Sequence, residues 1–320
     1  MNYLKRLNKK RIWLITGVAG FIGSNTADFL LKNNQVVIGI DNLKTSSLNN
    51  LRNLKKHKNF KFYKFNLEKK FDFKNKIDFC IHFAALNSVP RSFDYPSEVS
   101  KNNILSFINI ILLCKKLKIK KVVYASSSSV YGNTTKKTKK EDQKLNPISP
   151  YAVSKKVNEY HADIYASKEM KIIGLRFFNI YGHNQKNDKK YSAVIPSWIN
   201  SIEKNNSIKV FGSSIREFCY IDDAVRSILL ACFYKIKKDH EVFNISGGKK
   251  ISIKKLATKF KKVFGNKHTK ILLKKSRKGD VKIARASMKK IYQYMGFKPK
   301  YSIDEGLSKI KEIINLDENN

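Results

Sequence analysis

A tyrosine and a lysine four residues apart could act together as a general base. Tyr151 and Lys155 stand in the segment YAVSK, and the pattern of residues 151–168 predicts a helix that places both side chains on one face. A phenol has a reference pKa of about 10, which is too high for a base at neutral pH. A neighbouring ammonium favours the phenolate, so we expect Lys155 to lower the pKa of Tyr151. An ordinary Tyr/Lys pair on a helix surface is the alternative.

Four consecutive serines, in the segment SSSSVYG (126–132), precede this helix. Serine favours neither strands nor helices, yet these hydroxyls stand where the predicted strand 121–127 ends. Ligands of a parallel sheet bind outside the carboxyl ends of its strands. We therefore expect Ser127 to converge with Tyr151 and Lys155, and the serine hydroxyls to face a sugar or an alcohol. A serine-rich loop without chemistry is the alternative.

The segment ITGVAGFIG places Gly17, Gly20 and Gly23 between the predicted strand 12–16 and the predicted helix 24–33. Glycine permits a tight turn and lets backbone N–H groups approach a pyrophosphate, while the N-terminus of a helix adds a favourable dipole. The position of these glycines therefore predicts a dinucleotide-binding loop.

An acidic residue ends the next predicted strand, 35–41. Asp41 lies 18 residues beyond Gly23, where a carboxylate can accept hydrogen bonds from the adenosine ribose. A carboxylate there would repel a 2′-phosphate, which favours NAD over NADP. An aspartate that only caps a turn is the alternative, and the glycine loop beside it makes NAD binding the favoured interpretation.

The elements that must position these residues alternate along the first half of the chain. The predicted strands are 12–16, 35–41, 60–65, 77–84, 121–127 and 171–179, and the predicted helices between them are 24–33, 102–117 and 151–168. This alternation is typical of an α/β fold with a doubly wound parallel sheet, here Rossmann-like.

The regular alternation of predicted strands and helices ends after residue 179. Beyond it, helices are expected near 195–205 and 251–265. We predict an NAD-binding domain over 1–180, with a returning segment near 217–246, and a smaller α/β domain over 181–320 that mainly binds the substrate. The lysine-rich segment 134–144 is expected to be a solvated loop.

The composition limits the partners of the chain. Its 65 basic and 25 acidic residues give a net charge of +40, but only nine of the basic residues are arginine. The lysines are spread evenly, without the compact Arg/aromatic surface of a nucleic-acid reader, so composition bias is favoured over specific nucleic-acid binding. In either case the positive field should attract a polyanionic ligand such as a nucleotide.

No targeting, membrane or metal signal stands out in the sequence. The longest apolar run, 104–114, is too short to span a bilayer, and the basic N-terminus is interpreted as a tail that leads into the first strand. The four cysteines contain no C-x-x-C pair, and the six histidines are scattered. We expect no metal site, no disulfide framework and a reducing cytoplasm.

Taken together, the glycine motif, SSSSVYG, YAVSK and RFFNIYG resemble the extended short-chain dehydrogenase/reductase family. Within that family, the segments HFAALNSVPRSFDYP, SPYAVSKKVNE, AVIPSW and REFCYIDD are similar to bacterial UDP-N-acetylglucosamine 4-epimerases. The resemblance covers the chain from about Ile12 to Asp304.

The resemblance implies a mechanism. The Tyr151 phenolate would remove the proton of the sugar 4-OH while the C4 hydride passes to NAD. The 4-keto sugar would rotate in the site and take the hydride back on its other face. Ser127 would hydrogen-bond the 4-oxygen and help to move the proton, and Lys155 would bind the nicotinamide ribose and tune Tyr151.

The resemblance also implies which residues bind cofactor and substrate. Those for NAD are Gly17, Gly20, Phe21, Ile22, Gly23, Asp41, Asn42, Asn66, Leu67, Ala84, Ala85, Asn103, Tyr151, Lys155 and Phe178. Those for a UDP-sugar are Ser88, Arg91, Ser127, Ser128, Ser129, Asn179, Ala193, Val194, Arg216, Arg277, Asp280 and Ala284. The guanidinium groups of Arg216 and Arg277 would hold the diphosphate with fixed bidentate donors, and Asp280 would contact the uridine ribose.

The chain departs from the family pattern at several positions. Asn66 replaces an adenine-contacting aspartate, Asn87 replaces a glycine, and the loop before Arg216 is about two residues shorter. The serines of SSSSVYG replace the acids that 4,6-dehydratases and decarboxylases need, which argues against both reactions. A UDP-glucose or UDP-glucuronate 4-epimerase stays open, as does a basic nucleotide- or nucleic-acid-binding protein that kept only the fold.

Two finer expectations follow. The fourth residue after the RxGD aspartate walls the C2 pocket in the family, and Ala284 would leave room there for an acetamido group.

The helices 102–117 and 151–168 carry more apolar surface than one sheet face needs, and the family pairs them across a dimer. We therefore expect a homodimer, the alternative being that both helices simply cover the sheet.

Overall fold

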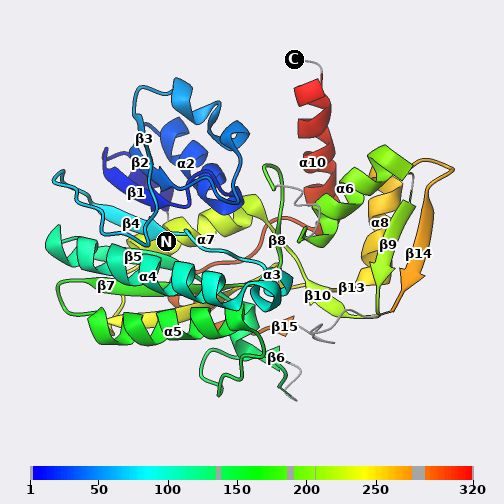
Figure 1. Ribbon diagram of the computed structural model, residues 1–320. Coiled ribbons are helices and arrows are strands. Elements are labelled where there is room, and N and C mark those ends of the chain that lie inside the picture. Colours follow the sequence, from blue (N-terminus) through cyan, green and yellow to red (C-terminus); the bar gives the residue numbers. More distant parts are fainter. Residues whose placement is uncertain (1–2, 135–137, 186–190, 206, 276–284, 319–320) are drawn as a thin grey trace.

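Seven strands form the central sheet of the computed structural model, which describes residues 3–134, 138–185, 191–205, 207–275 and 285–318 (Figure 1). All neighbouring strands in it are parallel. From one edge to the other they are β12 (His240–Ile245), β7 (Lys171–Phe177), β5 (Lys121–Ser127), β4 (Phe79–His82), β1 (Ile12–Thr16), β2 (Val36–Asp41) and β3 (Phe60–Lys64). The order reverses between β1 and β4, which confirms the doubly wound, Rossmann-like fold.

The strands lie where the apolar runs predict them, but β4 is shorter than predicted at both ends, and β7 ends at Phe177, two residues before the predicted 179. β1 and β5 have the predicted bounds, since both are buried from both faces and read as continuous apolar runs. β4 ends at His82, earlier than the predicted 84. Phe83 still donates its N–H to the Thr16 carbonyl at 3.0 Å, but the chain then turns across the glycine loop, where a Cβ on Gly17 would lie 2.7 Å from the Ala84 nitrogen.

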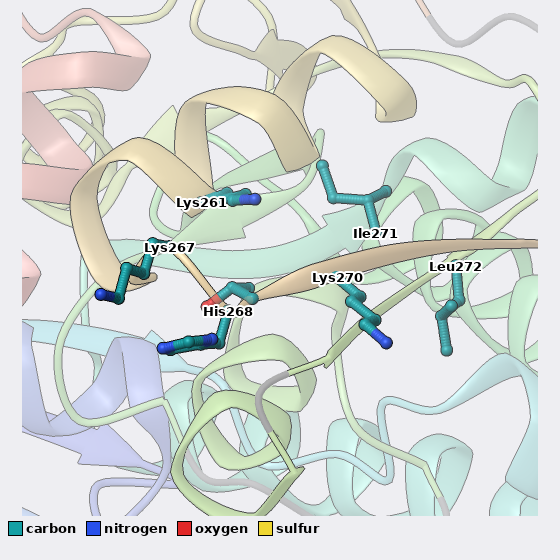
Figure 2. A pocket seen from close by; sticks show the side chains of 7 residues that line it. Lys261, Lys267, His268, Lys270, Ile271 and Leu272 are labelled. Carbon is teal, nitrogen blue, oxygen red and sulfur yellow. The ribbon is translucent and has the colours of Figure 1, made fainter.

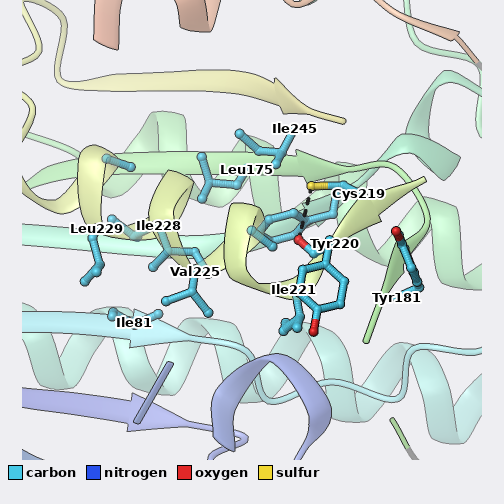
Figure 3. Packing of buried hydrophobic residues seen from close by; sticks show 14 of the residues in the cluster. Ile81, Leu175, Tyr181, Cys219, Tyr220, Ile221, Val225, Ile228, Leu229 and Ile245 are labelled. Carbon is cyan, nitrogen blue, oxygen red and sulfur yellow. Dashed lines mark hydrogen bonds between the residues drawn. The ribbon is translucent and has the colours of Figure 1, made fainter. Parts of the chain in front are cut away.

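Helices cover both faces of the sheet. α2 (Phe21–Lys32) and α7 (Ile221–Phe233) pack on the face that includes Ile15 and Ile81. Figure 3 shows Val225, Ile228 and Leu229 of α7 in this core, near Leu175 and Ile245 of the sheet. α4 (Pro96–Lys116) and α5 (Pro150–Tyr165) cover the opposite face, which includes Leu14 and Tyr124.

α4 and α5 begin before the predicted boundaries because each has a proline in its first turn, where the missing N–H is not needed. Ser149 caps α5: its hydroxyl accepts a hydrogen bond from the Ala152 N–H at 3.1 Å. The start of α5 is therefore fixed directly before Tyr151.

The other elements are short and surround the sheet. The helices are α1 (Tyr3–Leu7), α3 (Val89–Asp94), α6 (Val194–Asn205), α8 (Ile253–Phe264), α9 (Lys289–Met295), α10 (Ile303–Glu318) and the 3₁₀ turns η1 (Leu48–Leu51), η2 (Leu54–Lys56) and η3 (Ser128–Tyr131). The strands form the pairs β6 (Thr138–Lys139) with β15 (Arg285–Ala286), β8 (Ile180–Tyr181) with β11 (Cys219–Tyr220), β9 (Ser207–Phe211) with β14 (Lys270–Lys274), and β10 (Ile215–Glu217) with β13 (Lys250–Ser252).

Figure 1 shows α6, α8, β9 and β14 gathered to one side of the central sheet, while α7 and β12 return to it. The division of the chain near residue 180 stays a prediction.

The expectation of a solvated loop over 134–144 is wrong for its middle. Lys139 is 3% exposed, and its carbonyl accepts hydrogen bonds from Asn244 Nδ2 at 3.0 Å and from the Ser287 N–H at 2.8 Å. Partners more than a hundred residues away therefore hold this segment.

Candidate active site

The glycine loop lies where the strand order reverses, between the ends of β1 and β4. Gly17 has a left-handed backbone with φ +68°. A Cβ on Gly23 would lie 2.2 Å from the Gly17 carbonyl oxygen, so only glycine permits this packing of α2 on the loop. Gly20 is the N-cap of α2. This cradle leaves backbone N–H groups at the N-terminus of a helix, which fits the pyrophosphate of NAD.

Asp41 ends β2 beside the loop and is 7% exposed. One carboxylate oxygen accepts the Ala19 N–H at 3.0 Å, and the other accepts the Leu43 N–H and the Ser46 hydroxyl, both at 2.8 Å. The capping role that stood as the alternative is therefore present. It also fixes the carboxylate next to the glycine loop, which suits the predicted contact with the ribose.

The other residues predicted to bind the cofactor line the same edge of the sheet. Asn42 and Asn66 form local turns, in which their side-chain oxygens accept the Lys44 N–H at 3.0 Å and the Glu68 N–H at 3.1 Å. Leu67 is buried. The remaining predicted residues of this edge are half-buried: Phe21, Ile22, Ala84 and Ala85.

Asn103 of α4 holds neighbouring elements together. Its side-chain oxygen accepts the Leu86 N–H at 2.7 Å, and its Nδ2 donates to the Leu86 carbonyl at 3.2 Å and to the Ser154 hydroxyl at 3.0 Å. Its own carbonyl accepts Asn158 Nδ2 at 3.2 Å. Both amide hydrogens are used within the protein, so Asn103 braces the loop after β4 against α5 and reaches no ligand with its donors.

Ser127, Tyr151 and Lys155 converge at the carboxyl end of β5, as the sequence predicts. The Ser127 hydroxyl lies close enough to the Tyr151 phenol to favour its ionised form. The Lys155 ammonium lies 6.0 Å from the centre of the Tyr151 ring and donates to the Ala125 carbonyl at 2.9 Å. The Tyr151 phenol, the Ser127 hydroxyl and the Lys155 ammonium therefore lie together at the carboxyl end of β5.

The pKa of Tyr151 differs from the expectation. Burial raises its pKa, and the neighbouring Ser127 hydroxyl opposes that rise without cancelling it. Burial also lowers the pKa of Lys155 to about 8. The predicted lowering of the Tyr151 pKa by Lys155 is therefore not found in the protein alone: desolvation is the largest influence on Tyr151, and Lys155 is not among the groups that shift its pKa.

The four serines divide between the interior and the site. Ser126 points inward, and its hydroxyl donates to Glu159 Oε1 at 2.6 Å. Ser127 caps η3 by accepting the Ser129 N–H at 3.1 Å. Ser128 and Ser129 are half-buried at the rim. Only Ser127 directly faces Tyr151.

A buried ion pair under the catalytic group was not predicted. Arg176 of β7 donates to both carboxylate oxygens of Glu159, at 2.8 and 2.7 Å, one turn of α5 beyond Lys155. Arg176 also donates to the Tyr131 hydroxyl at 2.9 Å, which in turn donates to Asn244 Oδ1 at 2.6 Å. The Glu159 in SKKVNE and the Arg176 in LRFFN were visible in the sequence, but no local spacing indicates that they meet.

A cavity of about 230 Å³ lies among residues of β8, α6, β9 and β10, and we call it the Asn179 cavity. It is lined by Asn179, Ile180, Tyr181, Gln185, Ser192, Ala193, Val194, Ile195, Ser197, Trp198, Lys209, Phe211, Ser214, Arg216, Phe218 and Ile253. Four predicted substrate residues, namely Asn179, Ala193, Val194 and Arg216, are thus brought together. The aromatic and lysine members of this lining were not predicted.

Three other predicted residues lie near these features. Ser88 caps α3 by accepting the Arg91 N–H at 3.2 Å. The Arg91 guanidinium lies 3.4 Å from Glu98 Oε1 and 5.9 Å from the centre of the Tyr191 ring. Phe178 is completely buried against Tyr131, so it can support the nicotinamide region only from inside the core. Arg277, Asp280 and Ala284 lie outside the described residues.

A larger, open hollow lies elsewhere, between α8 and β14 (Figure 2). It measures about 880 Å³ and is lined by Lys261, Lys267, His268, Thr269, Lys270, Ile271 and Leu272. None of the predicted site residues is among them. The lysines there belong to the charge spread over the whole chain, and we assign the hollow no part in the site.

Two features are absent from the described part of the chain. Among those residues, no cluster of three histidine, cysteine or acidic side chains is arranged to hold a metal ion. The same residues contain no helix with the length and apolar character needed to cross a membrane.

Known proteins share this architecture over nearly the whole chain. "Putative UDP-glucose 4-epimerase" of Methanocaldococcus jannaschii is 34% identical over 311 residues, which cover 96% of this chain and 98% of that protein. The solved UDP-N-acetylglucosamine 4-epimerase from Methanobrevibacter ruminantium, in complex with UDP-N-acetylmuramic acid, has a TM-score of 0.88 and 30% identity over 96% of this chain and 99% of that one.

A UDP-glucuronic acid 4-epimerase mutant from Bacillus cereus, in complex with UDP-4-deoxy-4-fluoro-glucuronic acid and NAD, has a TM-score of 0.86 and 30% identity over 95% of this chain and 99% of that one. Residues 13–246 match the NAD dependent epimerase/dehydratase family. With the glycine cradle, Asp41 and the Ser127, Tyr151 and Lys155 group in place, the chain belongs to the NAD dependent epimerase/dehydratase family.

Proposed function

We propose that this NAD-dependent UDP-sugar 4-epimerase inverts C4 of a UDP-hexosamine and interconverts UDP-N-acetylglucosamine and UDP-N-acetylgalactosamine. The observation that carries the reaction type is the convergence of Ser127, Tyr151 and Lys155 at the carboxyl end of β5. NAD, when bound, supplies the chemistry of taking a hydride from C4 and returning it.

The side chains of the protein transfer the proton and position the reacting groups. The Tyr151 oxygen takes the proton of the sugar 4-OH as C4 is oxidised and gives it back as C4 is reduced. Ser127 holds the 4-oxygen through its hydroxyl and keeps Tyr151 aligned. Lys155, fixed by the Ala125 carbonyl, keeps a positive charge near the phenol when protonated.

Epimerisation is favoured over dehydration by what stands next to Ser127. Ser128 and Ser129 offer hydroxyls where a dehydratase needs an acid. Glu159, the carboxylate bound to Ser126, is paired with Arg176 and only 5% exposed, so it cannot serve as that acid. Incubation with UDP-N-acetylglucosamine should give the C4 epimer and no 4-keto-6-deoxy product, as resolved by chromatography.

The choice of the hexosamine rests on the family resemblance at Ala284. An alanine at this position would leave room for an acetamido group, whereas overlap with an aromatic ring costs about 1–3 kcal/mol, or one to two orders of magnitude in selectivity. Ala284→Tyr should abolish turnover of UDP-N-acetylglucosamine and preserve turnover of UDP-galactose, the internal control. If both activities fall together, or neither changes, Ala284 does not select the sugar.

UDP-glucose and UDP-glucuronate are the competing substrates, because 4-epimerases named for each are comparably similar to this chain. A panel of the three UDP-sugar pairs, compared by kcat/KM, decides among them. The highest value for a glucose or glucuronate pair would overturn the hexosamine assignment and leave the 4-epimerase assignment intact. Absence of epimerised product from every pair, with a protein that releases no NAD on denaturation, would favour a binding protein that kept only the fold.

We also propose a homodimer formed through α4 and α5. The sides of these helices that face away from the sheet carry exposed apolar residues at helical spacing: Leu105, Leu112, Val153, Tyr160 and Ile164. Ile164 is 74% exposed, and Ile164→Lys should convert a particle of twice the 37.0 kDa chain mass into one of that mass in sedimentation at micromolar concentration. A monomeric unmodified protein would overturn the dimer.

A further inference from the structure

Glu217 stands beside the Asn179 cavity and has no role in the proposed function. It ends β10, directly after Arg216, and is only 1% exposed. Neighbouring side chains of a strand point to opposite faces, so Arg216 lines the cavity while Glu217 points into the protein. A carboxylate is rarely buried without partners, which makes its surroundings informative.

One oxygen of the Glu217 carboxylate holds two separate segments. Oε2 accepts the Ser246 hydroxyl at 2.6 Å and the Ala286 N–H at 3.1 Å. The other oxygen, Oε1, lies 3.9 Å from Nε of Arg285, whose side chain is half exposed. The strand that carries Arg216 is therefore anchored to the end of β12 and to β15.

The backbone beside this anchor holds Asn179. Asn179 Nδ2 donates to the Glu217 carbonyl at 2.8 Å, and the Asn179 carbonyl accepts the Cys219 N–H at 3.2 Å. The φ of Asn179 is +38°, a conformation that costs a non-glycine residue on the order of 1–3 kcal/mol and persists only where its surroundings enforce it. The bonds to Glu217 and Cys219 supply that enforcement.

We propose that Glu217 is a positioning residue that holds Arg216 and Asn179 together for the nucleotide part of the substrate. Its carboxylate fixes β10 from the inside, β10 presents Arg216 on its other face, and the Glu217 carbonyl fixes the Asn179 amide. Glu217 itself touches no reacting atom. This inference rests on the proposed function, because it assigns the Asn179 cavity to the nucleotide.

The test measures the dissociation constant for UDP by calorimetry, with the NAD-containing protein and its variants. Glu217→Ala leaves the Ser246 hydroxyl and the Ala286 N–H without an acceptor, and a loss of about 1–3 kcal/mol corresponds to an expected rise in Kd of about 5- to 150-fold. KM for the UDP-sugar should rise with it, while kcat changes less. Glu217→Gln can place its amide oxygen at the Oε2 position, accept both bonds, and restore most of the UDP affinity.

Glu241→Ala is the matched control. Glu241 is also buried, at the opposite end of β12 from Ser246, with Lys290 Nζ at 3.6 Å. It should lower the thermal unfolding temperature without changing Kd for UDP. Where Glu217→Ala does not fold, Ser246→Ala removes one of the two donors and should still raise Kd.

Three results would overturn the inference. Unchanged UDP affinity in Glu217→Ala, with an unaltered protein that binds UDP, would reject the role of Glu217 and leave the proposed function intact. An equal rise in Kd for Glu217→Ala and Glu241→Ala would do the same, because it would reflect general destabilisation. An unaltered protein that does not bind UDP would instead reject the proposed function and this inference together.

Discussion

The proposed catalytic group stands at the end of a seven-residue strand, β5, whereas Asn179 and Arg216 of the Asn179 cavity lie beside or on strands of two or three residues, β8, β10 and β11. β5 pairs with β7 over its whole length, from Lys121 to Ser127, and with β4 over residues 122–124. β10 has one partner strand, β13, and its position also depends on the carboxylate of Glu217.

A long ladder distributes the positioning of a residue over many equivalent backbone bonds, none of which depends on side-chain identity. A short strand leaves the same task to one or two polar side chains. Substitutions of Ser127, Tyr151 or Lys155 should therefore slow the reaction without moving the neighbouring residues. Substitutions of residues that support the Asn179 cavity, such as Glu217, should shift their neighbours and weaken substrate binding first.

The largest effect is expected for Tyr151→Phe, which keeps the ring and removes the base. Turnover should fall by about 10²- to 10⁴-fold, with the thermal unfolding temperature unchanged. Tyr165→Phe is the matched control, since Tyr165 ends the same helix, lies outside both the site and the proposed dimer contact, and should leave turnover unchanged. Near-normal turnover in Tyr151→Phe would contradict the assignment of the base.

Arg176→Met tests an exception to this contrast between long and short strands. Arg176 lies on the long strand β7, but it pairs with Glu159 through its side chain. Removing one partner of a buried pair should lower the free energy of unfolding by about 3–5 kcal/mol. The double variant Arg176→Met, Glu159→Leu should recover part of that loss in chemical denaturation. A double variant less stable than both single variants would show that the pair is not the source of the effect.

Two alanine substitutions in the glycine loop, at Gly23 and Gly20, should differ in their effect on NAD affinity. In Gly23→Ala the new methyl would meet the Gly17 carbonyl oxygen at 2.2 Å, but in Gly20→Ala the same atom would be 3.1 Å away. Overpacking of the first kind costs about 1–3 kcal/mol, so Gly23→Ala should lose about 5- to 100-fold in NAD affinity by fluorescence titration, and Gly20→Ala clearly less. Equal losses would mean that contact with the loop does not decide cofactor affinity.

The smallest effect concerns pH. The pKa of Lys155 is lowered to about 8, below that of a lysine in the unfolded chain, so the unfolded chain binds more protons between pH 8 and about 10. The free energy of unfolding of the cofactor-free protein should therefore rise with pH in this window. The rise from pH 7.5 to 9.5 should exceed that of Lys155→Met by about 1–2 kcal/mol. Parallel pH profiles for the two proteins would argue against a buried, partly neutral Lys155.

The sequence predicts the catalytic side well because local patterns suffice there. Apolar runs locate β1 and β5, and the residues at their ends follow from the rule for parallel strands. Glu217 was missed because its partners, Ser246 and Ala286, lie 29 and 69 residues away. Lys139 was misjudged for the same reason, since a lysine-rich segment shows nothing of the distant Asn244 that binds it.

The bond from Lys155 to the Ala125 carbonyl affects more than alignment. A free lysine side chain loses roughly 1.5–2 kcal/mol of rotamer entropy when it is immobilised. With its ammonium already tied to β5, and with 2% of its surface exposed, Lys155 loses that freedom when the chain folds. Cofactor binding therefore meets an ordered cation, and the entropic penalty of organising this part of the site falls on folding instead of on each binding event.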